Sequence, residues 1–148
     1  MKDTTALEVR DLGSLPYAEA LALQADLVAR RRTGEIPDQL LLLQHPHIIT
    51  LGTGSSRVHV LADETRRREL GVDLVEVGRG GDVTYHGPGQ LVAYPILDLN
   101  GHRKDMRWFV HSLEDAMIAT AAAFGVTARR GAAGEEGILY FRNSMGTD

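Results

Sequence analysis

The sequence predicts an α+β fold with a mixed, mostly antiparallel β-sheet packed by helices. Two observations support this class: strand-like segments outnumber helical ones, and several adjacent strand segments are joined by only a few residues. Parallel neighbours need a crossover of about a dozen residues or more, so such short connections disfavour a doubly wound parallel sheet. The length of 148 residues predicts a single domain, residues 1–148, that can bury a core.

The first predicted elements are an edge strand and a helix. Residues 7–12 alternate between apolar and polar side chains, which is typical of a strand. Ser14 is placed to cap the helix, with Pro16 in its first turn. The helix then shows residues at helical spacing, namely Tyr17, Leu21, Gln24 and Val28. The run Arg30-Arg-Arg32 ends it.

Two short strands are predicted next, at residues 40–44 and 48–51, separated by His45-Pro46-His47. Residues 63–70 predict a short helix, with Asp63 as its N-cap and Gly71 as its stop.

The remaining elements are two strands, a long helix and a last strand. The two strands, 72–77 and 90–99, flank a glycine-rich loop. The helix carries its apolar face on Met106, Phe109, Val110, Leu113, Met117, Thr120, Ala121 and Phe124. Gly125 ends this helix, and residues 126–130 begin the last strand.

Composition excludes several functional classes. The longest apolar run, residues 40–43, is far too short to cross a membrane, and the first residues show no apolar secretory segment. We therefore expect a cytoplasmic protein with no membrane partner. A net charge of -4 argues against nucleic-acid binding, which requires a basic face. The absence of cysteine excludes disulfides, thiolate metal sites and cysteine catalysis by this sequence.

The segment from Gly78 to Gly89 is the most informative part of the chain. Five of its twelve residues are glycine, and it lies between two predicted strands. Glycine at this density indicates unusual backbone angles or close approach to another group. The same stretch carries a cation, hydroxyl donors, an imidazole and an amide, on Arg79, Thr84, Tyr85, His86 and Gln90. This combination predicts a ligand pocket, and the alternative is a hairpin with a long turn.

Individual polar residues leave alternatives open. His86 could be a hydrogen-bonded structural histidine or could line the pocket. Arg79 could hold a carboxylate, phosphate or carbonyl oxygen, or could pair on the surface with Asp82 or Glu76. The clusters 30–32 and 66–68, each of three arginines, lie near predicted helix C-termini. They either stabilise the helix dipole or dock an acidic partner.

Other motifs fall short of a site. His45 and His47 lack a third metal ligand at a recognisable spacing, so no metal is expected. Residues 52–57, Gly-Thr-Gly-Ser-Ser-Arg, resemble the start of a phosphate loop but lack its Lys-Ser/Thr. The sequence also has no Gly-x-Ser-x-Gly elbow that would supply a serine nucleophile.

The glycine-rich string closely resembles the signature of the octanoyltransferases (lipoyl(octanoyl) transferases, the lipoate-protein ligase B family). It reads Arg79-Gly-Gly-Asp-Val-Thr-Tyr-His86, continued by Gly87-Pro-Gly-Gln-Leu-Val-Ala-Tyr-Pro95. The resemblance covers most of residues 17–130. Outside the signature it rests on Tyr17-x-x-Ala-x-x-x-Gln24, Pro37-Asp38-x-Leu-Leu-Leu-Leu43, His45-Pro-His-Ile-Ile-Thr-Leu-Gly52, Trp108-Phe-Val-x-x-Leu-Glu114 and Phe124-Gly125.

The resemblance implies a fold, an activity and a site. The fold would be the class II synthetase-like catalytic domain of biotin- and lipoate-protein ligases. The activity would be transfer of octanoyl or lipoyl from acyl carrier protein to a lysine of lipoyl domains, without a cofactor, in lipoate biosynthesis. The acceptors would be E2 subunits of 2-oxoacid dehydrogenases and the H protein of the glycine cleavage system. The implied substrate-binding residues are Arg79, Gly80, Gly81, Asp82, Val83, Thr84, Tyr85 and His86, with Gly87, Gly89 and Gln90 as secondary pocket candidates. Gly80 and Gly81 would form the floor of the acyl pocket.

The sequence departs from this family in its reactive groups. The resembling enzymes use a cysteine and a nearby lysine from the C-terminal part of the domain, whereas this chain has no cysteine and only Lys2 and Lys104. We therefore expect no catalytic residue here, a chain that represents the N-terminal part of the domain, and no activity by the chain alone. Two alternatives stay open: an ATP-dependent relative of the lipoate- or biotin-protein ligases, and a non-catalytic acyl-binding protein.

Overall fold

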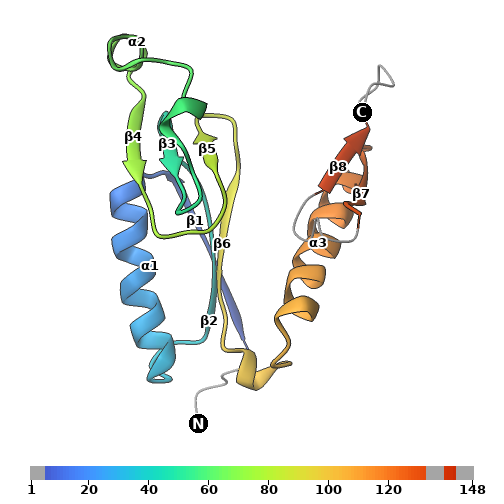
Figure 1. The fold of residues 1–148 in the computed structure, drawn as a ribbon. Coiled ribbons are helices and arrows are strands. Elements are labelled where there is room, and N and C mark those ends of the chain that lie inside the picture. The colour runs from blue at the N-terminus through green and yellow to red at the C-terminus, as the bar shows by residue number, and fades with distance from the viewer. Residues whose placement is uncertain (1–5, 133–138, 143–148) are drawn as a thin grey trace. The chain divides into compact units, whose positions relative to one another are not determined.

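The computed structural model describes residues 6–132 and 139–142. The chain divides into two compact units, Met1–Asp98 and Leu99–Asp148 (Figure 1). The mixed α+β class is confirmed, whereas a single domain over residues 1–148 stays a prediction. Each helix that the structure describes is too short or too polar to span a lipid bilayer.

The first sheet of the first unit has the strand order β1-β2-β6. Its strands are β1 (Leu7–Ser14), β2 (Asp38–Gln44) and β6 (Val92–Ile96). The strand β2 pairs parallel with β1 and antiparallel with β6. The edge position predicted for residues 7–12 is therefore confirmed.

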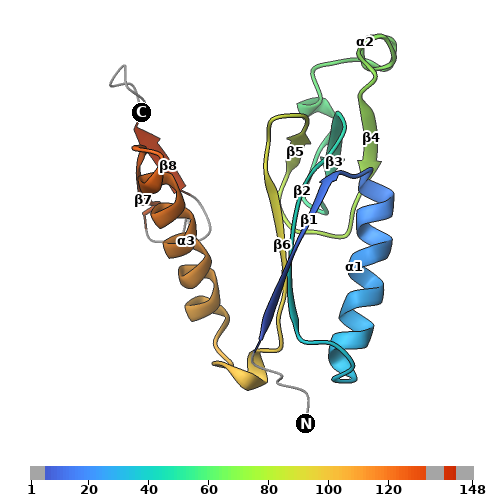
Figure 2. The ribbon, with the colours of Figure 1, turned by 180° about the vertical axis from the view of Figure 1, so that it is seen from behind.

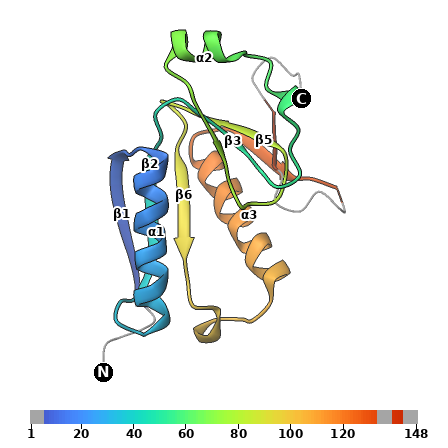
Figure 3. The same cartoon turned by 60° about the vertical axis from the view of Figure 1, so that its left-hand side comes forward.

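Helix α1 (Tyr17–Arg32) covers one face of this sheet and lies across β2 in Figure 3. Their contact is the hydrophobic core, because Ala20 and Leu27 of α1 pack with Leu41, Leu43 and Ile96 of the sheet. Alternation along β2 places Leu41 and Leu43 on the same face, where both are fully buried. Burial of one leucine side chain contributes about 1.5–3 kcal/mol.

The start of α1 differs from the prediction. Ser14 is not its cap, because β1 continues to Ser14, where it pairs with Gln44 of β2. The helix instead begins after Pro16, which has no capping side-chain hydrogen bond. The predicted helix end at Arg32 is confirmed.

A second sheet in the same unit has the order β4-β3-β5. Its strands are β3 (Ile48–Leu51), β4 (Asp73–Glu76) and β5 (Val83–His86), and Figure 2 shows β3 between the other two. The segment predicted as a continuous glycine-rich loop therefore contains a strand. The hairpin alternative is also wrong, because β4 and β5 each pair with β3 and not with each other.

Two short helical elements connect β3 to β4, namely η1 (Arg57–His59) and α2 (Glu64–Leu70). Both predicted ends of α2 are confirmed: the Asp63 carboxylate accepts a hydrogen bond from the Arg66 amide, and Gly71 adopts a left-handed backbone.

The second unit contains η2 (Leu99–Gly101), α3 (Met106–Ala123), β7 (Thr127–Arg130) and β8 (Leu139–Arg142). The predicted long helix and the strand after it are confirmed. Asp105 caps α3, and its hydrogen bond from the Trp108 amide holds the pKa of this carboxyl below its usual value. Arg130 of β7 binds the buried Glu114 of α3 at 2.8 Å, which fixes the strand to the helix.

The two arginine clusters are engaged in local ion pairs. In the first, Arg30 pairs with Glu35 at 2.7 Å, and the buried Arg31 binds the buried Asp38 at 2.5 Å. In the second, Arg66 pairs with Glu69 at 3.0 Å and Arg68 with Glu64. These contacts favour the structural interpretation of the clusters over a docking surface.

Candidate functional site

The glycine-rich segment is held against the turn that follows β3. Backbone amides of this turn donate hydrogen bonds to carbonyl oxygens of the segment, from Gly52 to Asp82 (3.2 Å), Thr53 to Arg79 (2.9 Å) and Gly54 to Gly81 (3.3 Å). Three consecutive amides thus fix the path of the segment between β4 and β5.

This contact explains why glycine is needed on the turn. A Cβ on Gly52 would lie 2.4 Å from the carbonyl oxygen of Gly81 and 2.9 Å from Nη1 of Arg79. On the segment itself, Gly81 adopts φ of +85°, which L-residues rarely tolerate. A Cβ on Gly80 would meet nothing within 4 Å. The close approach in this structure is therefore at Gly52, and the predicted role of Gly80 and Gly81 as pocket floor stays a prediction.

Arg79 turns back onto β3. Its Nη2 donates to the carbonyl oxygen of Thr50 at 3.0 Å and to the Thr50 hydroxyl at 2.8 Å, while Nη1 donates to the carbonyl oxygen of Gly80 at 3.0 Å. The surface ion pairs considered for Arg79 are not formed. Glu76 pairs instead with Arg57 at 2.6 Å.

Asp82 is likewise engaged elsewhere, because its carboxylate lies 2.6 Å from Nδ1 of His59. His59 belongs to η1, so this contact ties the glycine-rich segment to the connection between β3 and α2.

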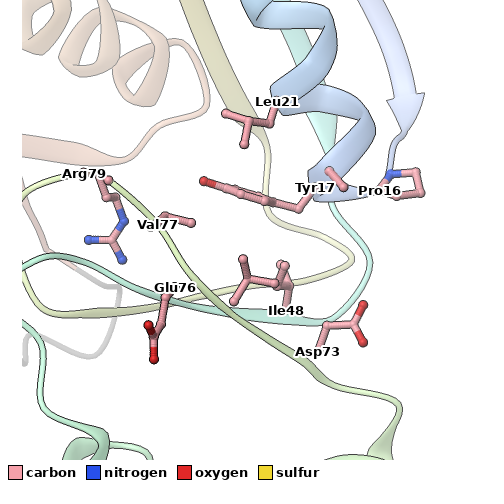
Figure 4. Close-up of a pocket in the computed structure, with 11 residues that line it drawn as sticks. Pro16, Tyr17, Leu21, Ile48, Asp73, Glu76, Val77 and Arg79 are labelled. Atoms are coloured by element: carbon pink, nitrogen blue, oxygen red, sulfur yellow. The ribbon is translucent and has the colours of Figure 1, made fainter.

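A cavity of about 530 Å³ lies between the start of α1 and the second sheet. Figure 4 shows Tyr17 and Leu21 entering it from α1, Val77 and Arg79 from the segment after β4, and Ile48 from β3. Its lining consists of Pro16, Tyr17, Ala18, Leu21, Ile48, Asp73, Val75, Glu76, Val77, Gly78 and Arg79. The lining is mostly apolar, with a guanidinium and two carboxylates near it, a composition suited to an amphiphilic ligand.

The register of the second sheet relates His86 and Thr84 to this cavity. His86 is paired with Ile48 and Thr84 with Thr50. Paired residues share a face, so His86 and Thr84 lie on the face that Ile48 presents to the cavity. His86 is half-buried, and its Nδ1 donates to the side-chain oxygen of Gln90 at 2.6 Å.

The alternate residues of β5, Val83 and Tyr85, lie on the opposite face of the sheet. The Tyr85 hydroxyl is 2.6 Å from Nδ1 of the exposed His47, and the two rings stack. A Cβ on Gly87 would lie 2.2 Å from the Tyr85 hydroxyl, so a larger residue there would require the Tyr85 side chain to move.

His45 and His47 point to different surroundings, so they do not form a pair of metal ligands. His45 is fully buried and hydrogen-bonded to Leu15 and Tyr94, whereas His47 is exposed beside Tyr85. Among the residues that the structure describes, no cluster of three potential metal ligands occurs.

Of the substrate-binding residues predicted from sequence, Arg79 lines the cavity directly. His86 adjoins it through its ring contact with His45, which in turn contacts Tyr17. Gly89 lies further along, where its amide donates to the Gln44 side chain at 2.7 Å. The remaining predicted residues, Gly80, Gly81, Asp82, Val83, Thr84, Tyr85, Gly87 and Gln90, are outside the lining of this cavity.

The predicted site residues did not include the other residues of the lining, among them Tyr17, Leu21 and Val77. Tyr17 belongs to Tyr17-x-x-Ala-x-x-x-Gln24, one of the strings that resemble the octanoyltransferases. This resemblance was the one signal that could have identified it. Leu21 and Val77 looked like ordinary core positions of a helix and a strand.

Comparisons of this chain with a protein family and with individual relatives agree with each other. Residues 16–143 match the family described as the lipoyl protein ligase A/B catalytic domain. An octanoyltransferase of Solibacter usitatus is 47% identical over 122 residues, covering 82% of this chain and 56% of the relative. One of Desulforamulus reducens is 47% identical over 112 residues, covering 76% of this chain and 49% of the relative. The chain spans about half the length of the curated relatives it matches.

Solved structures show the same fold. A bipartite lipoate protein ligase from Thermoplasma acidophilum aligns with a TM-score of 0.61 at 19% identity, covering 86% of this chain and 49% of that one. Lipoate-protein ligase A bound with ATP aligns with a TM-score of 0.55 at 16% identity, covering 86% of this chain and 50% of that one. The match to the family over residues 16–143 shows that this chain belongs to the lipoyl protein ligase A/B catalytic domain family.

Proposed function

We propose that this chain binds the acyl group in octanoyl transfer, within the biosynthesis of protein-bound lipoate. The observation that carries the proposal is the mostly apolar cavity next to Arg79, in a chain 47% identical to proteins named octanoyltransferase. A volume of about 530 Å³ falls within the usual range for small-molecule sites.

In this proposal the two ends of the cavity have different roles. Leu21, Ile48 and Val77 contact the hydrocarbon chain, since burial of methylene groups favours binding by about 0.8 kcal/mol each. Arg79 lies near the polar end, where its guanidinium is held by Thr50 and is preorganised to face a carbonyl oxygen. Arg79 is the residue of the segment 79–86 that lines the cavity, and we propose that the rest of the segment, with Gly87, Gly89 and Gln90, borders the site from outside this lining.

The proposed donor is octanoyl-acyl carrier protein, and the proposed acceptors are lipoyl domains, in the cytoplasm. The relatives named octanoyltransferase support the transfer itself. Support for the acceptor comes from the Thermoplasma acidophilum system, whose ligase was described together with its E2 lipoyl domain.

Binding of uncharged acyl probes to the 148-residue chain tests the acyl site. Affinity for butanamide, hexanamide and octanamide, measured by titration calorimetry, should increase with chain length. Val77→Asp places a charge in the cavity and should abolish octanamide binding. The matched control is Val58→Asp, because Val58 is 75% exposed and outside the cavity lining. Equal octanamide affinity in the two variants, both shown to be folded, would contradict the proposal.

Covalent chemistry distinguishes the transferase from the ligase alternative. Since the sequence has no cysteine, incubation with octanoyl-acyl carrier protein should leave the mass of the chain unchanged. A stable octanoyl adduct would reveal a substitute nucleophile. Octanoylation of a lipoyl domain that requires ATP would identify the chain as a ligase relative.

A further inference from the structure

His45 is a buried titratable group that has no role in the acyl site proposed above. Its side chain lies just after β2 and has an exposed fraction of 0%. Nδ1 lies 2.8 Å from the carbonyl oxygen of Leu15, and Nε2 lies 2.9 Å from the hydroxyl of Tyr94. A carbonyl oxygen only accepts, so Nδ1 carries the hydrogen, and Nε2 accepts the Tyr94 hydroxyl hydrogen. Both ring nitrogens are therefore satisfied in one neutral tautomer.

The ring of His45 contacts one aromatic ring that lines the cavity and a second one that adjoins it. The ring of Tyr17, which lines the cavity, has its centroid 5.3 Å away. The ring of His86 meets His45 edge-on with centroids 5.6 Å apart. His45 thus joins the start of α1 and the end of β5, with Tyr94 of β6 behind it.

The surroundings of His45 favour its neutral form. Burial lowers the pKa of His45, and the nearby His86 lowers it further, while the hydrogen bond with Leu15 acts in the opposite direction. Within the part of the chain that the structure describes, the titratable groups in contact with it are Tyr17 from α1, His86 from β5 and Tyr94 from β6, and none of them is a carboxylate. Burial also raises the pKa of Tyr94, which keeps its hydroxyl available as a donor.

We propose that His45 is a positioning residue of the acyl site: as a neutral imidazole fixed between Leu15 and Tyr94, it sets Tyr17 and His86 against the cavity. This inference rests on the proposed acyl binding. If Nε2 were protonated, its hydrogen would face the hydrogen of the Tyr94 hydroxyl. That hydroxyl would then have to rotate. Acyl affinity should therefore depend on the protonation state of His45, although His45 does not line the cavity.

The test compares Tyr94→Phe and His45→Gln with the control His47→Gln. His47 is the same residue type two positions later, also bonded to a tyrosine hydroxyl, but exposed and outside the cavity lining. Octanamide affinity is measured by titration calorimetry across pH, since this probe does not titrate there. In the same samples, NMR follows the imidazole carbon shifts of His45 and His86, and thermal unfolding confirms that each variant is folded.

We expect His45→Gln to weaken octanamide binding about tenfold and His47→Gln to change it less than about twofold. In the wild type, affinity should fall at acidic pH with the midpoint of the His45 titration. Tyr94→Phe removes the hydrogen bond that favours neutral Nε2, so it should move this fall to higher pH. A purely structural role would lower stability without moving the midpoint.

The outcomes separate this inference from the proposed function. If the wild type binds octanamide and Tyr94→Phe binds it with the same affinity and pH midpoint, the positioning role is refuted while acyl binding stands. That comparison remains decisive even if His45→Gln fails to fold. If the wild type binds no octanamide at any pH, both the proposed acyl binding and the proposed role of His45 are refuted.

Discussion

Replacement of Gly52 by alanine should displace the glycine-rich segment. The new Cβ would lie 2.4 Å from the carbonyl oxygen of Gly81 and 3.0 Å from that of Gly80, and both are backbone atoms that cannot rotate away. Overpacking of this kind costs about 1–3 kcal/mol. The Cβ would also lie 2.9 Å from Nη1 of Arg79, so the guanidinium should lose its present position.

The control is Gly54→Ala in the same turn. Its Cβ would lie 3.4 Å from the Gly81 carbonyl oxygen, which is close to ordinary van der Waals contact, so the cost should stay below about 0.5 kcal/mol. Neither Gly52 nor Gly54 has a positive φ, so alanine itself strains neither backbone.

Urea unfolding followed by circular dichroism gives the free energy of unfolding for both variants, and calorimetry gives their octanamide affinity. Gly52→Ala should be the less stable variant and should bind octanamide more weakly. Equal unfolding midpoints and equal affinities would show that the segment does not rest on this turn as described.

Two further predictions concern buried ionisable groups. Asp38→Asn should destabilise the chain by about 3 kcal/mol, because it removes the negative charge closest to the buried Arg31. Urea unfolding checks this, with Asp26→Asn as an exposed control. A cost below about 1 kcal/mol would contradict the prediction. The second prediction is pH-dependent stability: the pKa of His45 is lowered in the folded chain, so below its ordinary value of 6.5 the unfolded state binds more protons than the folded state. The contribution of His45 to the free energy of unfolding should be complete above that pH and should fall as the pH decreases toward the folded pKa. His45→Gln should remove this contribution. An unchanged pH dependence in that variant would contradict the assignment.

Elements with local signals could be predicted from the sequence. The ends of α2 were identified because the Asp63 cap and the left-handed Gly71 act on residues within one helical turn. The Ser14 cap failed because a long-range pairing with Gln44 extends β1 through that position. Strand β5 was missed because flanking glycines concealed four residues that pair with β3 from another part of the chain.

The candidate site, like the fold, could be predicted from the sequence only in part. Glycine density and the cation at Arg79 identified the segment that borders the cavity. Tyr17 could not be assigned to the cavity from spacing, because its place there depends on how α1 packs near the second sheet. The different surroundings of His45 and His47 could not be predicted from the sequence either. They depend on Leu15, Tyr94 and Tyr85, which are distant in sequence.

The pairing of β2 has a consequence for the order of folding during synthesis. Its parallel partner β1 is made before it, but its antiparallel partner β6, with Ile96 opposite Gln39, is made much later. Until residue 96 has left the ribosome, one edge of β2 remains unpaired beside a partly formed core. Unpaired strand edges promote association between nascent chains, and pairings distant in sequence form slowly. The interval between synthesis of β2 and β6 is therefore a period in which this chain is exposed to aggregation.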